Sequence, residues 1–349
     1  MPETLTHDAP ATARRPDTVV TGERVVLKIG TSSLVTAGRV DPVKLDRLCD
    51  SVHRGIVRGL RPVLLASGAI AIGRTRHPRL AENDAAAAQV AFALGQASLY
   101  SAIQSAFADR GLRTGQVLLT PPELLGSKVG LTLDTMLDLG MIPVVNENDA
   151  LGVRNNDVLA ALVAGHLQAG LLLLLTDVPG LHDGDPTRHI DEVRVLKPEI
   201  EALAGNTGSG SGGMRTKLGA CWIATYSGVR AVIADGGDPD ILTAAQDGRA
   251  MGTVFHPRAV TGATPPLDTL WRVFRAPARG TLRCTPAGTA LVEHGGALCR
   301  EHATGDVEPG DVVDIQGADG RTVARGVVAP GGRPIVAAGD YVWIVEEQS

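Results

Sequence analysis

The stretch VVLKIGTSS, residues 25–33, combines a short apolar run with a lysine and a turn of small polar residues. A continuous apolar run of this length, followed by glycine and serine, predicts a buried β-strand that ends at a tight turn. Lys28 lies near the end of that strand, and Gly30 opens the turn. An ammonium group beside small residues at a strand end is suited to contact a phosphate group.

Five more apolar runs predict buried strands, and the segments between them have helical spacing. The predicted strands are residues 62–66, 117–119, 142–145, 171–176 and 229–234. The helical segments include Leu45, Leu48, Val52 and Ile56, and an alanine-rich stretch at 84–109. This alternation predicts an α/β fold, a parallel-sheet sandwich with helices on both faces. On such sheets ligands bind beyond the carboxyl ends of the strands, where the motif-bearing loops of this chain fall.

A second lysine, Lys217, follows the Gly/Ser-rich segment GNTGSGSGGMRTK, residues 205–217. Because a helical pattern begins within it, the segment is interpreted as an anion-binding loop at a helix N-terminus. A flexible surface linker is the alternative. Gly208, Gly210 and Gly213 match GxGxxG, but the preceding residues look helical, whereas a dinucleotide site requires a strand there. Two lysines that reach one polyphosphate from separate elements indicate a small-molecule kinase.

Seven amide or carboxylate side chains follow the predicted strand at 142–145. They are Asn146, Glu147, Asn148, Asp149, Asn155, Asn156 and Asp157. Such groups could hold the ammonium and carboxylates of an amino acid, and a solvated loop with Asp157 as a helix cap is the alternative. The turn after residues 62–66 adds the Ser67 hydroxyl and the backbone N–H groups around Gly68.

Composition narrows the class of protein. At 349 residues the chain is long enough for two structural units, and 44% hydrophobic residues suffice for a core. The net charge of −5 gives no reason to expect nucleic acid or an anionic membrane. Four scattered cysteines without a CxxC pair favour a reducing cytosol over a disulfide framework or a zinc site. Residues 1–21 lack the apolar stretch of a signal peptide, and the leucine run at 171–175 is too short to span a bilayer. We therefore expect a cytoplasmic protein.

The sequence pattern changes after residue 258. Residues 259–278 are interpreted as a linker with a short helix. Residues 279–349 consist of short Val/Ile/Leu runs separated by Gly and Asp. Within them, DIQGADGRTV predicts a β-hairpin, so we expect a small all-β module. The module carries six basic and ten acidic residues, a balance of −4 that disfavours RNA binding. Residues 1–21 are expected to form a disordered extension.

Seven motifs occur in an order typical of one family: KIGTSS, SGAIAIG, GQVLLT, IPVVNENDA, LLLLTDVPGL, GGMRTK and GTVFHP. Across residues 22–258 the chain resembles the bacterial glutamate 5-kinases of the amino acid kinase superfamily, and the tail resembles a shortened PUA domain. The resemblance implies ATP-dependent phosphorylation of the glutamate γ-carboxylate, the first step of proline biosynthesis, with Mg2+ required. It also implies a homo-oligomer, dimer or tetramer, and a glutamyl-phosphate reductase as a downstream partner.

The resemblance also implies site residues. Lys28 and Lys217 would flank the transferring phosphoryl group, and Asp157 would orient them. The expected amino-acid ligands are Ser67, Gly68, Asp149 and Asn156. The expected ATP ligands, besides the two lysines, are Gly30, Thr176, Asp177, Ser211, Gly212, Gly213 and Met214. A carboxylate acceptor with a reference pKa of about 4.3 is already ionised at neutral pH, so no general base is needed. The nine histidines show no metal-ligand spacing, and no protein metal site is expected.

One departure from the family bears on the substrate. Where relatives usually have Gly-Asp-Asn-Asp, this chain has Arg154-Asn155-Asn156-Asp157. Arg154 and Asn155 are hypothesised to shift substrate affinity or to adapt the site to a related acid. Two other functions therefore stay open: a kinase of another carboxylate or phosphate acceptor in a specialised pathway, and a catalytically weak amino-acid-binding regulator.

Overall fold

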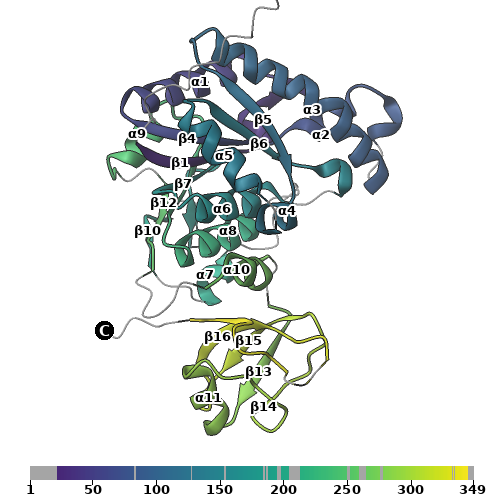
Figure 1. Cartoon of the computed structure of the whole chain (residues 1–349), viewed down its shortest axis with the longest axis vertical. Helices are drawn as coiled ribbons and strands as arrows, with labels where there is room; N and C mark the ends of the chain where they lie inside the picture. Colours follow the sequence, from purple (N-terminus) through teal and green to yellow (C-terminus); the bar gives the residue numbers. More distant parts are fainter. Residues whose placement is uncertain are drawn as a thin grey trace, which may run out of the picture.

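The computed structural model places a large α/β unit above a smaller β unit (Figure 1). It describes residues 22–81, 84–126, 128–152, 155–183, 185, 188–194, 198–203, 213–249, 252–258, 265–275, 278–331, 333 and 335–344. The proposed disordered extension, residues 1–21, lies outside this range.

The large unit is built on an eight-stranded sheet, with the order β10-β12-β11-β7-β1-β4-β6-β5. Its strands are β1 (Glu23–Ile29), β4 (Leu60–Ala66), β5 (Thr114–Leu119), β6 (Ile142–Glu147), β7 (Leu171–Thr176), β10 (Glu192–Val193), β11 (Arg230–Asp235) and β12 (Thr253–Phe255). All neighbouring pairs are parallel except β11 with β12. The predicted parallel sheet is confirmed, and each predicted strand lies within an observed one or overlaps it.

Successive side chains of each strand point to opposite faces of the sheet, and each face packs against its own hydrophobic core. In β1, Val25, Leu27 and Ile29 face one core, whereas Val26 faces the other. The first core is covered by α1 (Pro42–Val57), α2 (Ala69–Arg74), α3 (Ala85–Ala108) and α9 (Ile241–Gln246). The second is covered by α4 (Pro121–Gly126), α5 (Val129–Asp138), α6 (Asn156–His166), α8 (Met214–Tyr226) and α10 (Leu267–Phe274). Lys28 shares the face of Val26 and therefore points toward α6 and α8.

Helices α2 and α3 lie close together because a glycine of each helix packs directly against the backbone of the other. A Cβ on Gly73 would stand 1.7 Å from the carbonyl oxygen of Ala91, and one on Gly95 would stand 1.9 Å from that of Ala69. Any larger residue would force the helices apart. Since α2 begins at Ala69, this packing fixes the turn formed by Ser67 and Gly68.

The smaller unit is a five-stranded sheet with its own core, in the order β14-β13-β15-β16-β17. Its elements are β13 (Gly280–Cys284), α11 (Pro286–Glu293), β14 (Ala303–Thr304), β15 (Val312–Gln316), β16 (Thr322–Val327) and β17 (Tyr341–Trp343). The predicted hairpin is confirmed as the antiparallel pair of β15 and β16. The short helix predicted within residues 259–278 is α10, which packs on α8 and also contacts β15, β16 and β17.

Short elements complete the chain. They are the paired strands β2 (Val35–Thr36) and β3 (Arg39–Val40), the paired strands β8 (Leu181–His182) and β9 (His189–Ile190), the helix α7 (Pro198–Leu203), and the 3-10 turns η1 (Thr31–Ser33), η2 (Pro78–Ala81) and η3 (Asp149–Leu151). Within the described ranges, none of the helices combines the length and apolar character needed to cross a bilayer.

Candidate active site

The strand order places a ligand crevice at the end of β1. From β1 the chain continues to β4, β5 and β6 on one side, and later to β7 and β11 on the other. Crossovers that leave in opposite directions open a crevice beyond the strand ends at that point. Lys28 is the penultimate residue of β1 and is 6% exposed. The residue singled out by the first motif therefore lies at the switch point of the sheet.

Three ionised side chains meet on the α6/α8 face of that point. The Lys28 Nζ lies 2.9 Å from Oδ1 of Asp157, and the Lys217 Nζ lies 3.1 Å from Oδ2 of the same carboxylate. Asp157 is in the first turn of α6 and is fully buried, while Lys217 is in the second turn of α8 and is 6% exposed. The two lysine segments, almost two hundred residues apart in sequence, thus converge on one carboxylate.

The charge state of this cluster follows from its surroundings. Burial alone would raise the pKa of Asp157, but the ammonium groups of Lys28 and Lys217 outweigh burial and hold it below its ordinary value. The single proton of the Thr216 hydroxyl is shared between Oδ2, at 3.2 Å, and the carbonyl oxygen of Gly213, at 2.7 Å. Two cations and one anion leave the cluster with a charge of +1 in a poorly solvated place. Such a cluster is suited to attract an additional anion.

Helix α8 adds backbone donors beside the lysine. Gly213 is its N-cap residue and Met214 its first residue. The N–H groups of Thr216 and Lys217 donate to the carbonyl oxygen of Gly213, whereas helix geometry offers no intrahelical acceptor to those of Gly213, Met214 and Arg215. Free N–H groups and the helix dipole favour a phosphate at this end. Ser211 and Gly212, which were predicted to contact the same phosphates, lie outside the described residues, as do Gly208 and Gly210.

A neutral polar network lies at the ends of the adjacent strands. The Asn156 side-chain amide donates to Ser67 Oγ at 3.2 Å and to Asn146 Oδ1 at 2.6 Å, while its own Oδ1 accepts from the backbone N–H of Glu147 at 2.9 Å. Asn146 in turn donates to Gln96 Oε1 at 2.7 Å. The structure therefore brings Ser67 and Asn156 together, and Asn156 directly precedes Asp157 of the ion cluster.

One sequence prediction about this region was wrong, and the alternative that made Asp157 a helix cap does not hold. The strand does not end at Val145, because Asn146 and Glu147 continue β6 and pair with β5; both side chains are buried rather than solvated. The cap of α6 is Asn155 and not Asp157: Asn155 Oδ1 accepts from the N–H of Asp157 at 2.8 Å. Asp149 opens η3, which packs on α3. Arg154 lies outside the described residues.

The predicted nucleoside residues lie on the next strand. Thr176 ends β7, and its hydroxyl donates to the Asp177 carboxylate at 3.2 Å. Gly30 donates its N–H to Leu175 O at 3.3 Å, and a Cβ there would stand 3.2 Å from that oxygen, so a larger residue would push the turn away from β7. The turn after Lys28 and the end of β7 are therefore held side by side.

Gln96 and Thr216 extend the site beyond the sequence prediction, and the hydrogen bonds of Asn146, one of the seven predicted polar residues, place it in the same network. Gln96 lies four residues after Phe92 and three before Leu99, so helical spacing puts this polar residue on the apolar face of α3, and this was the signal that could have found it. Thr216 neighbours Lys217 and had no such signal. The contacts of all three depend on the tertiary fold.

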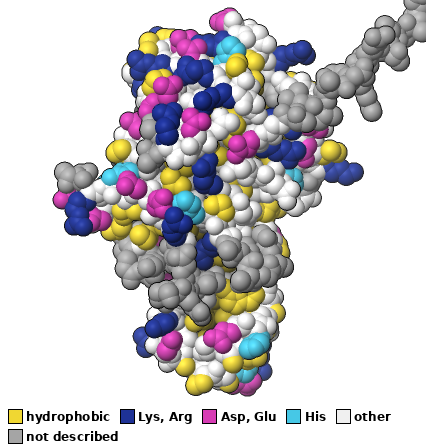
Figure 2. All heavy atoms as spheres, turned by 90° about the vertical axis from the view of Figure 1, so that its left-hand side faces the viewer, with side chains coloured by type: hydrophobic (Ala, Val, Ile, Leu, Met, Phe, Trp, Pro, Cys, Tyr) yellow, Lys and Arg dark blue, Asp and Glu magenta, His cyan; other side chains and the backbone are white. Residues whose placement is uncertain are grey.

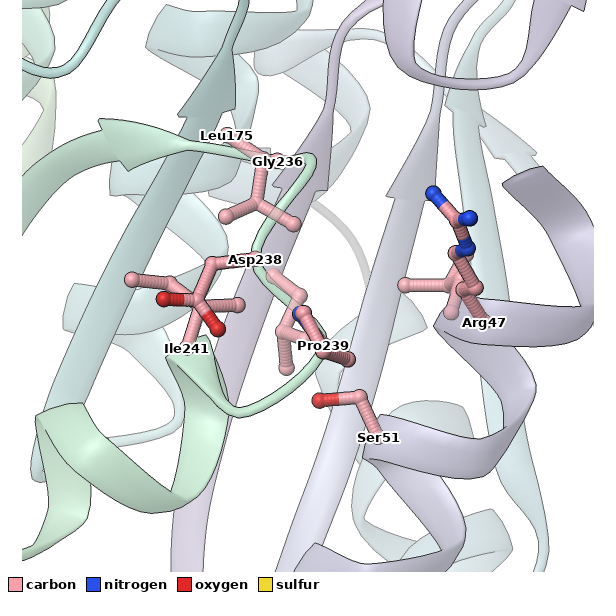
Figure 3. A pocket seen from close by; sticks show the side chains of 9 residues that line it. Arg47, Ser51, Leu175, Gly236, Asp238, Pro239 and Ile241 are labelled. Atoms are coloured by element: carbon pink, nitrogen blue, oxygen red, sulfur yellow. The ribbon is translucent and has the colours of Figure 1, made fainter.

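A small pocket lies on the opposite face of the sheet. It is lined by Arg47 and Ser51 of α1, and by Asp238 and Pro239 of the loop after β11 (Figure 3). Its space is only about large enough for one water molecule, so neither a nucleotide nor an amino acid fits there. Lys28 points away from it. The ion cluster and the polar network are therefore the better candidate site.

Comparison with known proteins agrees with this architecture. The sequence profile of the amino acid kinase family matches residues 23–235, and the chain belongs to that family. Within it, the chain is similar over most of its length to curated proteins named glutamate 5-kinase. The protein of that name from Salinispora arenicola is 37% identical over 338 residues, covering 89% of each chain. Its counterpart from Trichlorobacter lovleyi is 38% identical over 326 residues, covering 87% of this chain and 86% of the relative.

Solved structures support the fold. Carbamate kinase from Giardia lamblia, bound to AMP-PNP, superposes with a TM-score of 0.52 at 15% identity, covering 68% of this chain and 99% of that one. UMP kinase from Ureaplasma parvum superposes with a TM-score of 0.50 at 14% identity, covering 67% and 99%. At these identities the likeness concerns the fold alone.

Proposed function

We propose that the protein transfers the γ-phosphoryl group of ATP to the γ-carboxylate of L-glutamate, giving L-glutamyl 5-phosphate and ADP as the first step of proline biosynthesis. The observation that carries this proposal is the buried cluster in which Lys28 and Lys217 share Asp157 at the end of β1. The names of the relatives, which are glutamate 5-kinases, supply the acceptor.

The chemistry needs positioning and charge more than proton transfer. A γ-carboxylate oxygen forms a bond to the γ-phosphorus, and the bond from that phosphorus to the bridging oxygen of ADP breaks. Lys28 and Lys217 stabilise the charge on the transferring group, and Asp157 holds their ammonium groups in place. Because the acceptor is already ionised at neutral pH, no base is required.

In this proposal the substrate and the nucleotide bind at different residues beyond the ends of the strands. Ser67, the backbone around Gly68, Asp149 and Asn156 hold the amino acid, with Asn146 and Gln96 fixing the orientation of the Asn156 amide. Gly30 and the turn of Gly213 and Met214 hold the phosphates with the two lysines, and Ser211 and Gly212 are assigned to the same turn. Thr176 and Asp177 contact the nucleoside.

Mg2+ is expected to enter with the nucleotide. Among the described residues no three His, Cys, Asp or Glu side chains are grouped as metal ligands, and Asp157 is engaged by two lysines. Phosphate oxygens and water would therefore supply most of its coordination. Bound there, the ion would neutralise phosphate charge.

The test is ATP turnover with glutamate, in which the acyl phosphate is trapped as its hydroxamate. Aspartate, N-acetylglutamate and 2-aminoadipate serve as parallel acceptors. We expect hydroxamate with glutamate and none above background with aspartate. Turnover with another acid alone would overturn the glutamate assignment in favour of a related kinase. Amino-acid binding without turnover would favour the regulator.

The assembly and the location follow as further parts of the proposal. We place the enzyme in the cytoplasm as a homo-oligomer, a dimer or tetramer, that passes its labile product to a glutamyl-phosphate reductase. The smaller unit is assigned as a PUA-like domain with a role in stability, assembly or regulation. On the face drawn in Figure 2, basic and acidic side chains are interspersed over the described surface, an arrangement that disfavours RNA as a partner.

A further inference from the structure

Each hydrogen bond of the polar network at the strand ends has a direction that one backbone group sets. The network joins Ser67, Asn156, Asn146 and Gln96 through side-chain contacts of 3.2, 2.6 and 2.7 Å. An amide side chain carries a donating nitrogen and an accepting oxygen, and it could be turned either way in such a network. A neighbouring group that can only donate, or only accept, decides between the two.

The deciding group is the backbone N–H of Glu147. The pairing of β6 with β4 ends at Val145, so Glu147 lies beyond the last residue of β6 that pairs with β4. Its N–H, which can only donate, lies 2.9 Å from Oδ1 of Asn156, the first residue of α6. The oxygen of the Asn156 amide is therefore engaged by β6, and its nitrogen must face the rest of the network.

The Asn156 nitrogen uses both of its protons inside the network. It donates one to Asn146 Oδ1 and the other to Ser67 Oγ. Since its oxygen is occupied, Asn146 turns its own nitrogen toward Oε1 of Gln96, which is 6% exposed on α3. Every bond thus follows from the single donor at Glu147, and Ser67 accepts a hydrogen bond there rather than donating one.

The Ser67 hydroxyl consequently keeps its proton for another partner. A hydroxyl has one proton and two acceptor positions, and Asn156 fills one of the acceptor positions. In the part of the chain that the structure describes, Ser67 donates this proton to no protein acceptor. Its backbone N–H donates to Ile29 O at 3.1 Å, which fixes the turn, and the residue is partly exposed. A hydroxyl that accepts from an amide is also a stronger donor, because linked hydrogen bonds polarise one another.

We propose that Ser67 donates its proton to a carboxylate oxygen of the acceptor amino acid, in a direction that Glu147 imposes through Asn156. Asn146 and Gln96 complete the chain that holds the Asn156 amide in this orientation. Ser67 therefore selects an anionic group of the substrate, whereas an ammonium group would require it to accept. The inference deepens the proposed function and rests on it in one respect, the binding of an amino acid beyond β4 and β6.

Ser67→Ala tests which group of the ligand this residue contacts. Binding to the full chain is measured by calorimetry in the presence of AMP-PNP, with glutamate, with glutarate, which lacks the ammonium group, and with isoglutamine, whose α-carboxylate is an amide. We expect glutamate and glutarate to bind roughly 10- to 100-fold more weakly, as for the loss of one hydrogen bond to a charged group. An equal loss with isoglutamine would place Ser67 at the γ-carboxylate, and a smaller loss would place it at the α-carboxylate.

Two results of this titration would overturn the inference. A loss seen with glutamate but not with glutarate would show that Ser67 contacts the ammonium group. Unchanged affinity for all three ligands would show that its proton is not used. The matched control is Ser51→Ala, at a buried serine of α1 beside the small pocket on the opposite face of the sheet. We expect it to bind glutamate as wild type does, and a loss as large as that of Ser67→Ala would likewise count against the proposal.

Two further variants of equal charge test the direction of the chain. In Asn156→Asp the new carboxylate cannot donate, so Ser67 must give its proton to it, and the amides of Asn146 and Gln96 turn over. Adding Ser67→Ala should then cost little further glutamate affinity. In Asn146→Asp the carboxylate still accepts from Asn156, and Gln96 can turn its nitrogen to it, so adding Ser67→Ala should cost its full factor. Because both backgrounds carry the same added charge, the comparison isolates the direction.

The outcomes separate this inference from the proposed function. Equal costs of Ser67→Ala in the two backgrounds would overturn the assigned direction. If wild type binds glutamate but does not phosphorylate it, the proposed function fails, while the same titrations still decide the role of Ser67. If wild type binds neither glutamate nor any other acid of the acceptor panel, both fail.

Discussion

Two buried ion clusters in this protein have opposite compositions. In one, Lys28 and Lys217 share the single carboxylate of Asp157. In the other, Glu201 and Asp314 share the single guanidinium of Arg325. The first has a charge of +1 and lies within the large unit, whereas the second has a charge of −1 and joins α7 of the large unit to β15 and β16 of the smaller one.

The difference lies in the sign of each excess charge and in how far the charged side chains are exposed to water. The Arg325 fork makes short contacts to both partners, whose side chains are 25% and 21% exposed, so the excess negative charge reaches water. Burial alone would lower the pKa of Arg325, but the two carboxylates raise it above its ordinary value. The lysine cluster keeps its excess positive charge at side chains that are at most 8% exposed. The Arg325 cluster exposes its excess charge to water, whereas the lysine cluster holds its excess charge in a poorly solvated place that is suited to attract an added anion.

The largest effect is expected from Asp157→Asn. The change leaves two buried ammonium groups without their shared carboxylate, and removing one partner of a buried ion pair typically costs about 3 to 5 kcal/mol of folding free energy. Asp314→Asn should cost less than half of that, because Arg325 keeps its fork with Glu201. Denaturant unfolding of both variants measures the difference. Equal losses would show that the two clusters do not differ as described.

The same variant has a defined pH dependence. Because the folded-state pKa of Asp157 is depressed, its contribution to stability is present above the unfolded value of 3.8 and is lost as pH falls through the lower folded value. The stability difference between wild type and Asp157→Asn should therefore be constant from pH 8 to about pH 5 and shrink below about pH 4. A difference that shrinks between pH 7 and pH 6 would contradict the depressed pKa.

The next effect is expected from Lys217→Met and Lys28→Met. Each removes one positive charge from the place where phosphoryl charge develops, and loss of one such group typically lowers kcat by about 10²- to 10³-fold. Lys128→Met, at an exposed residue before α5, controls for the loss of a lysine as such. Hydroxamate formation measures all three. A Lys217→Met enzyme with normal kcat would show that this cluster is structural, like that of Arg325.

The sheet could be predicted from the sequence, and both lysines could be singled out from it. The strands are continuous apolar runs, and Lys28 stands out because burying a lysine within an apolar strand is costly. Gln96 was not assigned to the site because its partner there, Asn146, is 50 residues away in sequence. Arg325 and Glu201 are 124 apart, and nothing local marks either as half of a contact. The role of a residue that acts through a partner distant in sequence can be identified only from the tertiary structure.

The smallest effect is expected from Thr216→Val, which removes the neutral donor of the lysine cluster. The Thr216 hydroxyl lies 3.2 Å from Asp157 Oδ2 and 2.7 Å from the carbonyl oxygen of Gly213, so it links the carboxylate to the cap of α8. A hydrogen bond of this kind contributes about 0.5 to 1.5 kcal/mol, and the loss of that much transition-state stabilisation corresponds to a fall in kcat of roughly 2- to 13-fold.

Thr216→Ser is the matched variant, since it keeps the hydroxyl and loses only a methyl group, and it should retain nearly full kcat. The link acts through Asp157, so Thr216→Val should have little further effect in an Asp157→Asn background, where the carboxylate is already absent. Additive losses in the double variant would mean that Thr216 acts on the nucleotide directly. Thr216 would then contact the nucleotide itself, as the backbone N–H groups at the start of α8 are proposed to do, and would not act by positioning Asp157.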